Sequence, residues 1–156
     1  MNSVEGGFMM NTEELRKYLY KAITISNTIS ANLCSLQTLR DLVEGPKNSN
    51  MCLAKVKTNP TQDPLGDLLA QIVDLEDRYY QNIQQLLNRL HVIENLISNV
   101  SDDKERLILH CRYINTKKWS EVAEFTNYSE KQVHNIHNKA LQSLQKYVIE
   151  NAIELV

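Results

Sequence analysis

Residues 119–133 read WSEVAEFTNYSEKQV, and their pattern predicts two helices joined by a tight turn. Its first part predicts a short helix over residues 120–125 with one apolar face. A tight turn follows, in which Asn127 is the residue best able to take a left-handed conformation. Ser129 and Gln132 then form a Ser-x-x-Gln capping box, which predicts the start of a new helix. The inward residues of the short helix are expected to be Val122, Ala123 and Phe125.

The segments on either side of this stretch are also predicted to be helical. Ser101 is expected to cap a preceding helix that runs to Tyr113 or Ile114, with Leu107, Ile108 and Cys111 facing inward. The helix after Ser129 carries a buried stripe at helical spacing: Val133, Ile136, Ala140, Leu141, Leu144 and Val148. Three helices with a tight turn between the last two predict a helix-turn-helix over residues 101–150.

The N-terminal half predicts two long helices, at residues 11–44 and 63–100. Asn11, with Glu14 three residues on, is expected to cap the first helix, and Asp63 the second. Apolar residues recur every seven positions: Leu15, Ala22, Ile29, Leu36 and Val43 in the first helix, and Leu65, Ile72, Tyr79, Leu86, Ile93 and Val100 in the second. These stripes predict a long antiparallel, coiled-coil-like hairpin over residues 11–100, or helices that also meet a second copy of the chain.

The predicted architecture is therefore all-α, with the hairpin preceding the helix-turn-helix domain. Gly45–Pro46 ends the first helix, and residues 45–63 are expected to form a mobile loop. Residues 1–10 are expected to be a disordered N-terminus without the features of a signal peptide, and residues 151–156 a tail.

Composition limits the possible functions. The chain of 156 residues has 17 basic and 19 acidic residues, a net charge of −2, which argues against unselective coating of nucleic acid. Residues 104–146, however, hold eight Lys or Arg against four Asp or Glu, a local excess of four positive charges. No run of about 18 apolar residues suggests a membrane span. Three widely spaced cysteines favour a reducing cytoplasm over a disulfide framework.

The stretch at residues 119–133, together with the Val-x-x-Ile-x-x-Lys-Ala-Leu-x-x-Leu frame from Val133 to Leu144, resembles the helix-turn-helix of sigma factor region 4. That module reads the −35 element of promoters. The preceding run ERLILHCRYI, residues 105–114, resembles the lead-in of phage transcriptional activators of the RinA and ArpU kind. The sequence has no counterpart of the sigma region that melts promoter DNA. The resemblance thus implies an accessory regulator and not a complete sigma factor.

The resemblance also implies which residues contact DNA. Contacts to bases are expected from Ser129, Glu130, Lys131, His134 and Asn135. Contacts to phosphates are expected from Lys117, Lys118, Asn138 and Lys139. Amide and basic side chains are the types that read base edges or bind the backbone.

We therefore expect a sequence-specific DNA-binding transcription regulator, which the resemblance implies is a phage or prophage late-gene activator in the cytoplasm of a bacterial host. Its expected partners are double-stranded DNA, RNA polymerase and a second copy of the chain. Two alternatives remain: an adaptor that binds polymerase without reading DNA, and a DNA-packaging recognition subunit with ring-sized assemblies. No enzymatic activity or cofactor is expected, since no phosphate loop or Ser/His/Asp order is visible. His134 and His137 have metal-compatible spacing but lack a third ligand, so no metal is expected.

Overall fold

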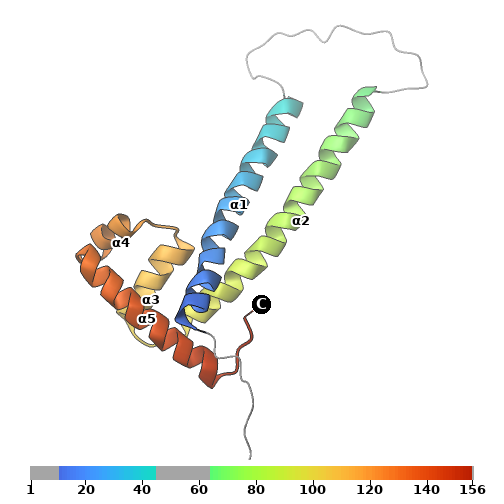
Figure 1. Cartoon of the computed structure of the whole chain (residues 1–156). Coiled ribbons are helices and arrows are strands. Elements are labelled where there is room, and N and C mark those ends of the chain that lie inside the picture. The colour runs from blue at the N-terminus through green and yellow to red at the C-terminus, as the bar shows by residue number, and fades with distance from the viewer. Residues whose placement is uncertain (1–10, 45–63, 156) are drawn as a thin grey trace, which may run out of the picture. The chain divides into compact units, whose positions relative to one another are not determined.

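The computed structural model describes residues 11–44 and 64–155, and all regular structure in these ranges is helical (Figure 1). The prediction of an all-α chain, with two long packed helices before a helix-turn-helix domain, is confirmed. The predictions for residues 1–10, for the loop at 45–63 and for the cap at Asp63 lie outside the described residues. None of the described helices is both long enough and apolar enough to cross a membrane.

The two long helices are α1, Thr12–Glu44, and α2, Pro64–Ser98. The cap of α1 forms as predicted: the Asn11 side chain accepts a hydrogen bond from the Glu13 N–H at 3.1 Å. In return, the Glu14 carboxylate accepts one from the Asn11 N–H at 3.0 Å. This reciprocal pairing satisfies two backbone donors that a helix start otherwise leaves open.

The chain folds into two compact units. Within the described residues, unit 1 comprises residues 11–27 and 87–155 and unit 2 comprises residues 28–44 and 64–86, so each long helix contributes to both. This division does not fall at the predicted boundary between residues 100 and 101, because the base of the hairpin belongs with the helix-turn-helix. The separate functions predicted for residues 11–100 and 101–150 stay predictions.

Among the described residues, the only helices of unit 2 are the later part of α1 and the first part of α2. Ile29, Leu36 and Ile83 are buried there, whereas Ile72, Tyr79 and Leu86 are half-buried. Arg40 pairs with Glu76 at 3.5 Å and with the Tyr80 hydroxyl. Val43, at the end of the predicted first stripe, is exposed, and the side chain of Leu65 lies outside the described part of the chain.

Unit 1 has a main hydrophobic core that joins the hairpin base to the last helix. The third helix, α3, spans Asp103–Leu109 and continues as a π-helical turn, η1, over His110–Ile114. From this helix, Leu109 and Tyr113 face the main core. Its other buried members are Leu15, Tyr18, Leu19, Ala22, Ile93, Leu96, Ile97, Val100, Ala140, Leu141, Leu144 and Val148. Burial of this apolar surface makes the base of α1 and α2 part of the helix-turn-helix fold.

A second, smaller core lies on the other side of α3. Ile108 and Cys111 pack there with residues of the two following helices, α4, Trp119–Thr126, and α5, Glu130–Glu150. The remaining members are Val122, Ala123 and Val133. The third helix is thus buried on two faces, which explains why the neighbouring residues Ile108 and Leu109 are both buried.

Three local predictions in unit 1 are wrong. The cap of α3 is Asp102 and not Ser101, because the Asp102 carboxylate accepts the N–H groups of Lys104 and Glu105 at 2.9 and 3.0 Å. Leu107 is 43% exposed, since the two buried faces of α3 leave it outside both cores. Phe125 is 58% exposed because Val122 and Ala123 already occupy the inner face of α4.

Candidate nucleic-acid interface

The start of α5 is fixed by a tight turn after α4. Asn127 adopts the left-handed conformation expected of it, with φ 56° and ψ 31°. The Ser129 hydroxyl accepts the Gln132 N–H at 3.3 Å, and the Gln132 side chain accepts the Ser129 N–H at 3.0 Å. The predicted capping box therefore forms, and it holds the first turn of α5 in a defined orientation.

The polar residues predicted to contact DNA from α5 share its exposed side. Buried residues of α5, such as Val133 and Leu141, occupy the opposite side. The Ser129 hydroxyl is engaged in the cap, since it also donates to the Gln132 side chain at 3.0 Å. Its base contact stays a prediction, as do those of the other residues. The exposed members are Glu130, Lys131, His134, Asn135, Asn138 and Lys139.

His134 is held in place by an aromatic neighbour. Its ring packs on Trp119 with centroids 4.5 Å apart and planes at 45°. Trp119 also meets His137 edge-on at 4.8 Å, and the Arg112 guanidinium lies 4.8 Å from the centre of its ring. Trp119, the only tryptophan of the chain, is therefore a half-buried anchor that packs against the second core.

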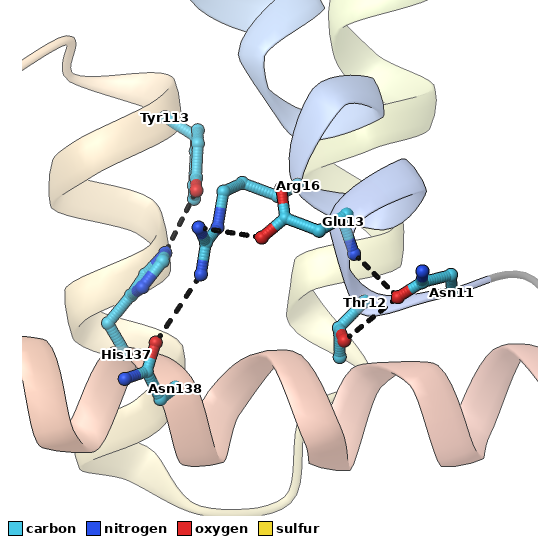
Figure 2. A network of polar contacts seen from close by, with 7 residues as sticks. All are labelled: Asn11, Thr12, Glu13, Arg16, Tyr113, His137 and Asn138. Atoms are coloured by element: carbon cyan, nitrogen blue, oxygen red, sulfur yellow. Dashed lines mark hydrogen bonds and ion pairs between the residues drawn. The ribbon is translucent and has the colours of Figure 1, made fainter.

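His137 lies on the inner side of α5 and is only 3% exposed. Its Nε2 is 2.8 Å from the Tyr113 hydroxyl, the contact drawn in Figure 2. Burial, followed by the charge of Arg16, lowers the pKa of His137 to about 4. Burial also raises the pKa of the Tyr113 phenol well above its usual value. The Tyr113–His137 pair is therefore neutral at pH 7. Separately, no group of three metal-ligating side chains occurs among the described residues.

Arg112 connects the π-helical turn to the segment before α4. Its guanidinium donates to the Lys117 carbonyl at 2.7 Å and to the Tyr20 hydroxyl at 3.3 Å. The same group stacks on the rings of Tyr20 and Trp119. The sequence analysis assigned no role to Arg112 or Arg16. The only signal for Arg112 is its place in the run ERLILHCRYI, residues 105–114.

Lys117 and Lys118 precede α4, where the chain turns sharply. Thr116 has φ 53°, a left-handed conformation that reverses the backbone after η1. The Lys118 N–H donates to the Glu121 carboxylate at 2.7 Å, which fixes the helix start, and the Lys118 side chain is exposed. The Lys117 ammonium lies 5.5 Å from the centre of the Phe125 ring. The exposed Phe125 ring thus attracts the ammonium group of Lys117, which is a predicted phosphate contact, by a cation–π interaction.

A cavity of about 340 Å³ lies between α5 and the start of α3. Asn135, Ile136 and Lys139 line it from α5, and Asp102 and Lys104 line it from the other side. Lys104 therefore lines the same cavity as two predicted contact residues, Asn135 and Lys139. The sequence offered no signal for this proximity, which arises only when α3 packs on α5.

The comparisons with known proteins agree with this geometry. The family model for sigma-70, region 4 matches residues 102–146, which include α3, η1, α4 and residues 130–146 of α5. No significant match was found among curated proteins, and none among solved structures. Sigma-70 region 4 is a DNA-binding domain. Residues 102–146 of this chain are therefore a sigma-70 region 4 domain with a helix-turn-helix fold.

Proposed function

We propose that the protein is a sequence-specific DNA-binding transcription regulator that inserts α5 into the major groove near a promoter. The observation that supports this most directly is the exposed polar row of α5, on a capped and braced helix inside a sigma-70 region 4 domain. An α-helix fits the major groove, where each base pair presents a distinct pattern of donors and acceptors.

The finer parts of the proposal rest on sequence resemblance. Similarity of residues 105–114 to the lead-in of RinA- and ArpU-type activators supports a phage or prophage late-gene activator that works in a bacterial cytoplasm. Sigma-70 region 4 can interact with RNA polymerase, which supports polymerase as a second partner. We propose no cofactor, metal or catalytic activity.

We also propose that the long helices pair with a second copy of the chain. Unit 2 leaves many large apolar side chains exposed, namely Leu33, Leu42, Val43, Leu68, Leu69, Val73, Leu75 and Tyr80. Apolar surface gathered on one two-helix unit favours association. A DNA motif recovered from a random library would report such a dimer through the symmetry and spacing of its half-sites.

Single substitutions Lys131→Ala and Asn135→Ala are expected to abolish specific retardation of the duplex recovered from such a library. Both side chains are exposed on the proposed reading face, and each bidentate base contact contributes roughly 1–3 kcal/mol of discrimination. Electrophoretic mobility shift with the recovered duplex and a scrambled competitor measures the effect.

Lys146→Ala is the matched control, because Lys146 is exposed on the same helix but pairs with Glu150 near its C-terminal end. It should bind like the parent protein. If Lys131→Ala and Asn135→Ala also bind like the parent, α5 is not the reading helix. An adaptor that contacts polymerase alone would show no salt-dependent duplex binding in any variant.

The double variant Lys117→Gln/Lys118→Gln is expected to weaken binding to all duplexes alike. Contacts to phosphates carry no sequence information, and each one lost should reduce the salt slope of log K by about 0.9. Titrations at several salt concentrations measure the slope. Arg78→Gln/Arg89→Gln removes the same charge from exposed positions of α2 and should leave the slope unchanged. Equal slopes for the two double variants would exclude the proposed phosphate contacts.

A further inference from the structure

Arg16 belongs to α1 but lies beside the proposed reading helix. Its Nη2 donates to the Asn138 side-chain oxygen at 3.5 Å, and its Nη1 pairs with Glu13 at 3.0 Å, as Figure 2 shows. Both contacts lie within unit 1. The basic side chain therefore reaches the exposed side of α5 from outside the segment that matches sigma-70 region 4.

The positive charge of Arg16 is incompletely balanced. Its carboxylate partner, Glu13, is 60% exposed, and exposed ion pairs are weak. The Arg16 Nε is buried and has no hydrogen-bond partner among the described residues. The buried groups nearby, Tyr113 and His137, are neutral at pH 7 and offer no countercharge. The guanidinium thus retains capacity to bind an anion through its 36% exposed side chain.

The position of Asn138 on α5 indicates which anion this would be. Lys131, His134 and Asn138 follow one another at helical spacing on the exposed side. Asn138 lies seven residues after Lys131, which is about 10 Å along a helix. Because the major groove is about 12 Å wide, a side chain this far from the inserted turn lies near the groove edge, where the phosphates are.

We propose that Arg16 binds a phosphate of the DNA backbone and that Asn138 positions its guanidinium for this contact. A planar guanidinium can engage phosphate oxygens with two parallel hydrogen bonds. The proposal rests on the proposed DNA-binding function and extends it. The base of the N-terminal hairpin becomes part of the DNA-binding surface, in addition to its part in the core.

The experiment measures binding of the full chain to a fluorescein-labelled, random-sequence duplex of about 30 base pairs by anisotropy, between roughly 50 and 200 mM NaCl. Arg16→Gln is expected to weaken binding several-fold for every sequence and to reduce the salt slope by about 0.9. Arg16→Lys keeps the charge but not the two parallel donors. It should retain the slope and lose part of the affinity.

Arg40→Gln is the matched control. Arg40 is also on α1 and also pairs with a carboxylate, but it lies in unit 2. This variant should keep the parent slope. Urea unfolding followed by Trp119 fluorescence verifies that each variant retains the folded helix-turn-helix.

The outcomes distinguish failure of the proposed phosphate contact from failure of the proposed DNA-binding function. If the parent protein binds the duplex and Arg16→Gln keeps its slope, the phosphate contact is wrong while DNA binding stands. A purely structural tie between α1 and α5 would lower the unfolding midpoint without changing the slope, and would also overturn the proposal. Loss of slope in Arg40→Gln as well would indicate a general charge effect and would count against the proposal. A parent protein without duplex binding would refute the proposed function itself.

Discussion

Leu19→Ala is expected to lower the free energy of unfolding of the helix-turn-helix by about 2–5 kcal/mol, although Leu19 lies more than eighty residues before it in sequence. Leu19 is fully buried in the main core of unit 1, in the same cluster as Leu141 and Leu144 of α5. Shortening it removes apolar contacts from the core that α1 shares with α5 and leaves a cavity that close-packed surroundings fill only in part.

Trp119 makes this prediction specific. It is the only tryptophan, and it reports on α4 and the second core, in which Leu19 has no part. A urea titration followed by Trp119 fluorescence therefore measures whether damage in α1 unfolds the DNA-binding domain. The midpoint should fall while the steepness of the transition stays the same.

Leu33→Ala provides the control, because Leu33 lies on the same helix but is 52% exposed in unit 2. Its effect on the Trp119 transition should be within about 0.5 kcal/mol. An unchanged Trp119 midpoint in Leu19→Ala would mean that the helix-turn-helix folds independently of the hairpin base. The boundary expected at residues 100 and 101 would then be correct.

Local sequence signals predicted the local structure of this protein well. The turn at Asn127, the capping box of Ser129 and Gln132 and the cap at Asn11 all form as expected, because each depends on residues within one helical turn. The exposed side of α5 was also predictable, since helical periodicity alone separates it from the buried stripe.

The features that the sequence did not reveal depend on contacts between distant segments. Periodicity in α1 indicated an apolar stripe but not that its first turns share a core with α5. Leu107 was expected to be buried because a single inner face was assumed for α3, whereas the helix has two. No pattern in the sequence links Arg16 to Asn138, which lies 122 positions later. Their proximity follows only from the shared core beneath them.

A fall in pH is expected to destabilise the helix-turn-helix through His137. Burial lowers its pKa from the ordinary value of 6.5 to about 4, and the nearby charges of Arg16, His134 and Arg112 act in the same direction. Between these two values the unfolded chain binds a proton that the folded chain does not. The folded state is therefore most stable above pH 6.5, where His137 is neutral in both states, and its stability falls as the pH drops toward 4.

The expected loss between pH 7 and pH 5 is about 2 kcal/mol, measured as the urea midpoint of the Trp119 transition at each pH. His137→Phe should be less stable at pH 7, because the buried Tyr113 hydroxyl loses its partner, but its stability should vary less over this range. His91→Gln removes an imidazole whose side chain is 69% exposed, and should keep the pH dependence of the parent. If His137→Phe shows the parent's full pH dependence, the sensitivity arises elsewhere, and His137 does not resist protonation inside the fold.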